Sequence, residues 1–403
     1  MNSSEQPDNS QPISTWQLFL IFLKLGLTSF GGPIAHIAYF RDEFVTRRRW
    51  LTDHSYADLV ALCQFLPGPA SSQVGLAIGL SRGGYTGAIV AWVGFTFPSA
   101  LVLVLFAMSL SSLDNTTMFG IIHGLKIVAV AVVAQAVWSM AKNLCPDRTR
   151  LSIMAITTSV VLLIPHPATQ LLVIIIAGLI GTVLFKANDA EQSESIPLKI
   201  SERAGKIALS LFFILLLGLP LLTQLFPSQS LLIIDIFYRA GALVFGGGHI
   251  VLPLLQSELV PNGLINNDTF LAGYGAAQAV PGPLFTFAAF IGASLENVSV
   301  LQGTLLSLIA IFLPSFLLVI GVLPFWNKLQ KNSKMRSALL AINAAVVGLL
   351  LAALYNPVWT STILSTQDFV FGLLALSLLM FWKLPPWLVV ILSGLSGWLL
   401  TLI

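Results

Sequence analysis

The stretch 64–69 reads QFLPGP, and 278–283 reads QAVPGP, 214 residues later. Each stretch lies inside an apolar run that is long enough to cross a membrane. Proline lacks a backbone N–H and glycine weakens helices, so a Pro-Gly-Pro sequence interrupts the helix that contains it. The two stretches therefore predict helices that are broken at equivalent places in a duplicated chain.

Further short motifs repeat at nearly the same spacing, with offsets between 214 and 216 residues. They are FGGP (30–33) with FGGG (245–248), FPS (97–99) with LPS (313–315), AVV (131–133) with AVV (345–347), and AGLIG (177–181) with SGLSG (393–397). Chance matches between apolar helices would not keep this register. The sequence therefore indicates an internal duplication.

Composition places these repeats in a membrane. Charged residues make up 9% of the 403-residue chain and hydrophobic residues 56%, whereas soluble domains are about 25% charged. This excludes a soluble enzyme, a nucleic-acid-binding protein and a disordered chain. The net charge of +3 decides little, and Cys63 and Cys145 form no CxxC motif. The first 15 residues contain no Lys or Arg, so we expect no cleavable signal peptide.

Hydropathy predicts an all-α polytopic membrane protein with thirteen apolar segments. The expected regions are a polar tail (1–15), a first membrane repeat (16–186), a charged linker with one unpaired helix (187–230) and a second membrane repeat (231–403). The second repeat begins seven segments after the first. Because seven is odd, the repeats point in opposite directions across the membrane, as in many secondary transporters.

The distribution of positive charge favours re-entrant hairpins at the FGG and PGP motifs. If all four of these segments enter the membrane and return, nine helices span, and the 17 Lys and Arg outside the segments lie on the N-terminal side. That side is then the cytoplasm. With thirteen plain spans, the loop with Arg41 and Arg47 falls on the other side. The alternative is that the motifs are kinks between closely packed full spans.

The quoted motifs resemble the chromate ion transporter family in its long form with two fused repeats. The resemblance rests on FGGP (30–33), LPGPASSQ (66–73), FGGGH (245–249) and AVPGPLFTFAAFIG (279–292), and it covers about 16–403. It implies a transporter that expels chromate from the bacterial cytoplasm, driven by the membrane energy gradient, with sulfate as a competitor. Gly248 departs from the pattern, because the first repeat has Pro33 at that place.

Lys24 and Arg239 are the leading candidates for binding an oxyanion, since each lies seven residues before the first glycine of its FGG motif. Seven residues is about two helical turns, so the cation and that glycine share a helix face. A dianion that leaves water needs cations and N–H groups in return. The alternative is that both side chains reach back to the membrane surface. The other substrate-binding candidates are Gly31, Gly32, Gly68, Gly246, Gly247, Gly282, Gln64, Gln278, Ser71 and Thr286.

Four carboxylates are candidates for carrying a coupled proton: Glu43, Glu258, Asp58 and Asp235. Glu43 and Glu258 are repeat-equivalent. All four can also be read as plain interfacial charges. No residue pattern indicates a catalytic site, a metal site or a cofactor, and the spacing of the histidines does not suit a metal ion.

Together these features predict a secondary transporter that exports a divalent oxyanion, chromate or a sulfate-like ion, from the cytoplasm. The chain has no Walker A sequence, so it is not expected to use ATP. The alternatives are a membrane enzyme that acts on lipid or prenyl phosphates, and an anion channel. The expected partners are the oxyanion and the lipid bilayer, with a homodimer left open and no nucleic acid. The expected location is the bacterial inner membrane, with a cytoplasmic N-terminus.

Overall fold

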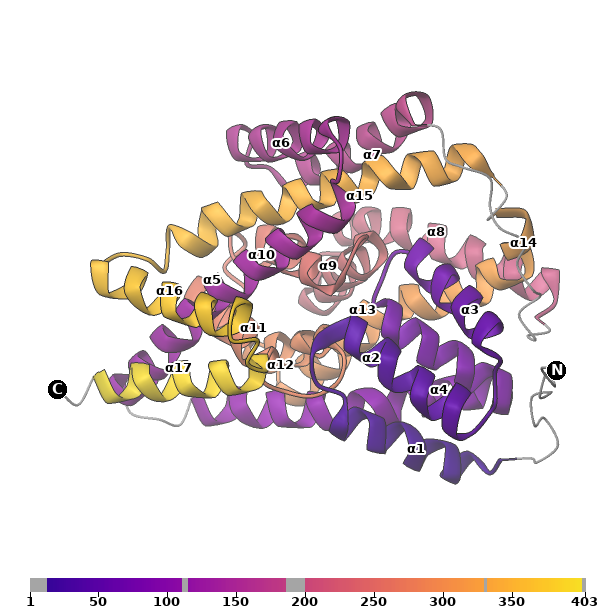
Figure 1. Ribbon diagram of the computed structural model, residues 1–403, viewed down its shortest axis with the longest axis horizontal. Coiled ribbons are helices and arrows are strands. Elements are labelled where there is room, and N and C mark those ends of the chain that lie inside the picture. Colours follow the sequence, from indigo (N-terminus) through magenta and orange to yellow (C-terminus); the bar gives the residue numbers. More distant parts are fainter. Residues whose placement is uncertain (1–12, 111–114, 186–199, 330–331, 401–403) are drawn as a thin grey trace.

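The protein is helical throughout the part that the structure describes (Figure 1). The computed structural model describes residues 13–110, 115–185, 200–329 and 332–400. No strand occurs within those ranges. Most of the predicted N-terminal tail and of the predicted charged linker lies outside the described residues.

All four segments that carry FGG or PGP are broken at the motif, as predicted. In each case one helix ends just before the motif and another begins at or shortly after it. The pairs are α1 (Thr15–Thr28) with α2 (Gly32–Arg41), α3 (Asp53–Phe65) with α4 (Ala70–Leu110), α9 (Gln229–Leu243) with α10 (Val251–Leu259), and α11 (Asn267–Ala277) with α12 (Phe287–Ser294). The interruption is therefore a repeated property of the fold.

The helix that follows each PGP motif crosses its successor through glycines. In the first repeat the two helices are merged into α4, with non-helical angles at Gly83 and Gly84. In the second repeat they are separate, as α12 and α13 (Val300–Val322). A Cβ on Gly292 would lie 2.3 Å from the Gly303 carbonyl oxygen, so no side chain fits at this crossing.

Each repeat contributes helices that pack on the other repeat. The remaining long helices are α5 (Asn115–Leu144), α6 (Arg148–Leu163), α7 (Pro167–Leu184), α8 (Glu202–Leu225), α15 (Ser333–Ala353), α16 (Thr366–Met380) and α17 (Pro386–Leu400). The first-repeat helix α5 packs against α16 and α17, and its equivalent α15 packs against α6 and α7. Figure 1 shows α6, α7 and α15 lying together along one long edge of the molecule. The two repeats are thus interlocked.

The repeated AGLIG and SGLSG motifs form these interlocking contacts. A Cβ on Gly181 would lie 2.7 Å from the Cβ of Ala341, and a Cβ on Gly397 would lie 2.3 Å from the Gly120 carbonyl oxygen. Small residues let membrane helices approach each other closely. Each copy of the motif therefore forms an equivalent close contact between helices.

We expect Gly397→Ala to destabilise the protein by about 1–3 kcal/mol, because the added methyl group overlaps backbone that cannot move away. The thermal unfolding temperature of the protein in detergent would report this loss. Gly394→Ala is the matched control on the same helix, since its Cβ would lie 3.7 Å from a Leu125 side-chain atom, an ordinary contact. Equal unfolding temperatures for the two variants would contradict the packing argument.

Five helices are long and apolar enough to cross a membrane by length and composition: Ala70–Leu110, Thr117–Leu144, Glu202–Leu225, Val300–Phe325 and Ser333–Trp359. Several shorter apolar helices accompany them, among them α16. Large apolar side chains such as Leu217 and Leu225 on α8 lie on the outside of the molecule. In water such a surface would be unfavourable, and in a bilayer it faces lipid. The protein is a polytopic membrane protein.

Candidate functional site

The four helix breaks meet in two equivalent pairs. The Gly68 N–H of the first PGP motif donates to the Val244 carbonyl oxygen at 2.7 Å, directly before the second FGG motif. The Gly282 N–H of the second PGP motif donates to the Ser29 carbonyl oxygen at 2.9 Å, directly before the first FGG motif. Each FGG break therefore contacts the PGP break of the other repeat, and the two contacts are related by the internal duplication.

The serines of the repeated Pro-Ser motifs reinforce these two contacts. Ser99 Oγ donates to the Pro281 carbonyl oxygen. At the equivalent place, Gln73 Nε2 donates to the Pro67 carbonyl oxygen at 2.7 Å and to Ser315 Oγ at 3.4 Å. Carbonyl groups freed by a broken helix need such partners inside a membrane. The FPS serine thus bonds a PGP carbonyl directly, whereas at the equivalent place Gln73 bonds the PGP carbonyl and also contacts the LPS serine.

We expect Ser99→Ala to destabilise the contact between the repeats by about 1 kcal/mol, because the Pro281 carbonyl oxygen loses its donor. The unfolding temperature of the protein in detergent should fall modestly. Ser159→Ala is a suitable control, since Ser159 Oγ only donates to the Ala155 carbonyl oxygen of its own helix. A Ser99→Ala protein that unfolds at the same temperature as the control would argue against a supporting role for Ser99.

Glycine is required for different structural reasons in the PGP motifs and in the FGG motifs. A Cβ on Gly68 would lie 2.6 Å from Ser315 Oγ, and a Cβ on Gly282 would lie 2.4 Å from Ser99 Oγ. A Cβ on Gly32 or Gly247 would meet nothing closer than 4.0 Å, although both residues have positive φ. The PGP glycines thus permit close approach, whereas the second glycine of each FGG motif permits the backbone turn and has open space beside it.

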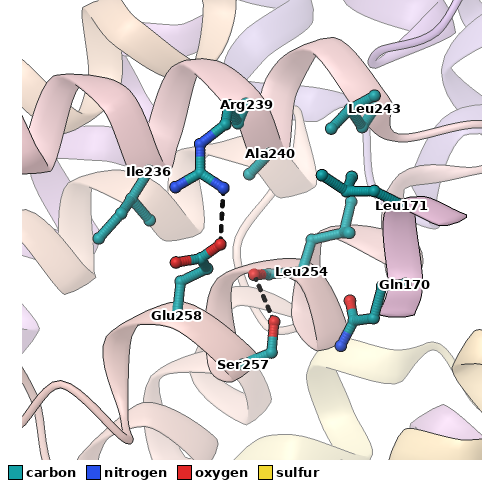
Figure 2. Close-up of a pocket in the computed structure, with 9 residues that line it drawn as sticks. All are labelled: Gln170, Leu171, Ile236, Arg239, Ala240, Leu243, Leu254, Ser257 and Glu258. Carbon is teal, nitrogen blue, oxygen red and sulfur yellow. Dashed lines mark hydrogen bonds and ion pairs between the residues drawn. The ribbon is translucent and has the colours of Figure 1, made fainter. Parts of the chain in front are cut away.

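The charged candidates of the second repeat lie together. Arg239 Nε and Nη2 donate to the two carboxylate oxygens of Asp235 at 3.0 and 2.9 Å, and Nη1 donates to Glu258 Oε1 at 2.6 Å. These residues come from α9 and from α10, which are joined by the FGG break. Arg239 and Glu258 line a small pocket that Gln170 of α7 also borders (Figure 2). The structure therefore brings one predicted cation and two predicted proton carriers into one cluster.

The charged candidates of the first repeat are arranged differently. Lys24 is exposed on α1 and has no acidic partner among the described residues. Glu43 is buried, but it binds Arg47 and Arg48 at 3.1 and 2.6 Å. Asp58 lies 3.3 Å from His54 Nδ1. The internal duplication has thus diverged in its charges while keeping its backbone contacts.

The polar candidates near the PGP motifs are also unequal. Gln64 is exposed, whereas the Nε2 group of Gln278 is buried without a partner among the described residues. Thr286 Oγ1 donates to the Pro283 carbonyl oxygen, and Ser71 Oγ lies 3.3 Å from His36 Nδ1. Gln278 therefore has a free donor, and Thr286 is occupied by its own backbone.

His36 is a residue of this region that was not among the predicted site residues. It is buried, and its Nε2 lies 3.1 Å from the Ser29 carbonyl oxygen. Because a carbonyl oxygen can only accept, Nε2 carries the proton. His36 stands four residues after Gly32, one helical turn from the break. That spacing could have placed the imidazole beside the FGG motif.

Within the described part of the chain, the buried hydroxyls of Ser29, Ser72 and Thr96 have no hydrogen-bond partner.

Lys126, a cation inside the apolar helix α5, forms an ion pair. Its Nζ lies 2.6 Å from Asp268 Oδ1, and its side chain is 7% exposed. His123, one turn earlier on α5, binds Asp368 at 2.7 Å. These two pairs join α5 to helices of the second repeat.

The fold and its interrupted helices define a polytopic membrane transporter built from two repeats. The chain belongs to the chromate transporter family, whose sequence model matches residues 16–182 and 231–398, one match for each repeat. It is a transporter and not an enzyme. The two matched regions agree with the duplication found from the motifs.

Three relatives show how far the likeness extends. An uncharacterised transporter of Methanocaldococcus jannaschii is 29% identical, over 87% of this chain and 86% of the relative. A chromate transport protein of Pseudomonas aeruginosa is 27% identical over 96% and 93%. A chromate transport protein of Cupriavidus metallidurans is 25% identical over 88% and 87%. No solved structure matches the chain.

Proposed function

We propose that this protein is a secondary transporter that exports a divalent oxyanion, most specifically chromate, from the cytoplasm across the inner membrane of a bacterium. The observation that carries the proposal is the pair of reciprocal contacts between FGG and PGP breaks, in a chain of the chromate transporter family. Relatives named as chromate transport proteins support chromate as the substrate. A sulfate-like ion has the same shape and charge and is the natural competitor.

The broken helices supply the chemistry that an oxyanion requires. A helix that begins inside a membrane presents unpaired N–H groups and the positive end of its dipole, and both favour anions. The α2 helix begins at Gly32 beside Ser29 and His36. In the second repeat Arg239 supplies a cation next to α10, through Glu258 near the end of that helix. Since the two contacts are equivalent by duplication, opening one and closing the other would expose the ion to opposite faces in turn.

The orientation belongs to the same proposal: nine helices span, the four broken segments are hairpins, and the N-terminus is cytoplasmic. We expect single cysteines placed in 41–56 of a Cys63→Ser, Cys145→Ser protein to react with a membrane-impermeant maleimide only from the cytoplasm. Cysteines placed in 259–267 should react only from outside. Reaction of 41–56 from outside would contradict the hairpins and favour thirteen plain spans.

Transport itself is tested in inverted membrane vesicles with chromate, sulfate and molybdate compared. We expect saturable uptake of chromate and counterflow of a preloaded oxyanion, with sulfate competing. Flux that follows the voltage without saturating would instead identify an anion channel. Absence of flux combined with turnover of a lipid phosphate would identify a membrane enzyme. The mass of the detergent-solubilised protein tests the homodimer that the proposal leaves open.

A further inference from the structure

The pocket between α7, α9 and α10 is lined by one cation and one carboxylate, Arg239 and Glu258, and Asp235 binds Arg239 beside it. We propose that Arg239 exchanges its hydrogen bond to Glu258 for one to the oxyanion, and that Glu258 takes up one proton as the anion binds. The inference rests on the proposed function, because it concerns how the same substrate is held. It adds a chemical condition to that function: a proton accompanies each bound anion on the protein.

Arg239 is committed to two carboxylates in the arrangement that the structure shows. Each of its three guanidinium nitrogens donates to a carboxylate oxygen, at distances of 2.6 to 3.0 Å, which leaves two of its five N–H groups. With both acids ionised, Asp235, Arg239 and Glu258 carry a net charge of −1. A partly buried negative cluster repels a second anion, since charges interact strongly away from water. The cluster must lose negative charge before an oxyanion can bind there.

Glu258, and not Asp235, is placed to give up the arginine. Asp235 is held through both of its oxygens and its side chain is only 3% exposed. Glu258 is held through one oxygen, its side chain is 19% exposed, and it comes from the other half of the broken helix. In Figure 2 the single dashed contact between Arg239 and Glu258 spans the pocket. Adding a proton to this carboxylate leaves a neutral acid and frees Nη1–H for an oxyanion oxygen.

The rest of the pocket suits this exchange. Its lining contains no titratable group besides Arg239 and Glu258; the other lining residues are Gln170, Leu171, Ile236, Ala240, Leu243, Leu254 and Ser257. Asp235 binds Arg239 from beside the pocket. The Oε1 atom of Gln170 is buried and accepts no hydrogen bond within the described part of the chain. A carboxylate offers only acceptors, whereas a protonated Glu258 brings a donor, so protonation adds a donor to a pocket lining that has an acceptor without a partner.

The first repeat lacks an equivalent cluster of one cation and two carboxylates. Leu20 stands at the place equivalent to Asp235, and the equivalent acid Glu43 is bound to Arg47 and Arg48. Lys24, at the place of Arg239, has no acidic partner among the described residues. Proton-linked binding is thus a property of the second repeat alone.

The test measures binding of sulfate and of chromate to the purified wild-type protein, at pH values where both oxyanions are fully ionised. Uptake of one proton per anion predicts that the affinity for the anion weakens about tenfold for each unit by which the pH rises, as long as Glu258 is ionised in the free protein and protonated in the complex. Calorimetry in two buffers of different ionisation enthalpy should show the same single proton taken up. Asp53→Asn, which breaks the exposed pair with Arg41, is the control and should keep the pH dependence.

Variants of the cluster decide the assignment. Glu258→Gln should bind the anion with an affinity that no longer changes with pH, and Asp235→Asn should keep the dependence. The double variant Arg239→Gln, Glu258→Gln keeps the net charge of −1 and should lose anion binding at this site, without two uncompensated carboxylates that could unfold it. The inference is overturned if Glu258→Gln keeps the wild-type pH dependence, or if the wild type takes up no proton when the anion binds. Neither result would contradict the proposed function. Failure of the wild type to bind or transport either oxyanion would instead overturn the proposed function.

Discussion

Gly282→Ala should lower oxyanion transport by roughly tenfold to a hundredfold. At a φ of +95° a side chain costs about 1–2 kcal/mol relative to glycine. The new Cβ would also lie 2.4 Å from Ser99 Oγ, so Ser99 has to rotate and lose its bond to Pro281, at about 1 kcal/mol. Since about 1.4 kcal/mol is a factor of ten, the combined cost is large for one methyl group. Initial rates in vesicles, normalised to the amount of protein in the membrane, would measure the loss.

Gly218→Ala is the matched control for this substitution. Gly218 lies in the interior of α8 with no atom near the place of a Cβ, so alanine should be tolerated or slightly stabilising. Gly68→Ala, the repeat-equivalent change, should behave like Gly282→Ala, because its Cβ would meet Ser315 Oγ at 2.6 Å. Wild-type transport by both PGP variants would show that the contacts between the breaks are dispensable.

Arg239→Gln should abolish transport and also destabilise the protein. The change leaves Asp235 and Glu258 facing each other without a cation, and removing one partner of a buried ion pair costs about 3–5 kcal/mol. Both the unfolding temperature and the transport rate should therefore fall. Arg41→Gln is the control, because Arg41 and Asp53 form an exposed pair that contributes about 0–1 kcal/mol.

Lys24→Gln tests the other proposed cation without destabilising the protein, since no carboxylate loses its ion-pair partner. If Lys24 binds the oxyanion, its loss should weaken binding by about 1.5–3 kcal/mol, roughly tenfold to a few hundredfold. Its stability should stay near that of the wild type. An unchanged half-saturation would assign Lys24 to the membrane surface and leave Arg239 as the cation that binds substrate.

The breaks and the duplication could be predicted from the sequence, because both depend on local chemistry. Pro67, Gly68 and Pro69 interrupt a helix wherever they occur, and a constant offset reveals repetition without any knowledge of packing. The seven-residue spacing before each FGG motif likewise selected Lys24 and Arg239 as equivalent positions.

The partners of these residues could not be predicted. The Gly68 N–H meets Val244, far along the chain, and a single sequence carries no signal for such a pairing. Asp235 was a candidate proton carrier with a plain interfacial charge as the alternative, and its ion pair with Arg239 was not predicted, although a spacing of four residues is that of a pair on one helix face. The bond to Glu258 depends on how α10 folds back after the break, which is set by the positive φ angles of Gly246 and Gly247.

The interlocked repeats also constrain how the protein can be made. Gly120 and Gly124 on α5 closely contact Ser393 and Gly397 on α17, which lies far along the chain. During synthesis α5 therefore emerges long before α17. The close backbone contact between the two helices can form only after α17 has been made, so a chain truncated before α17 would leave this face of α5 uncovered in the membrane.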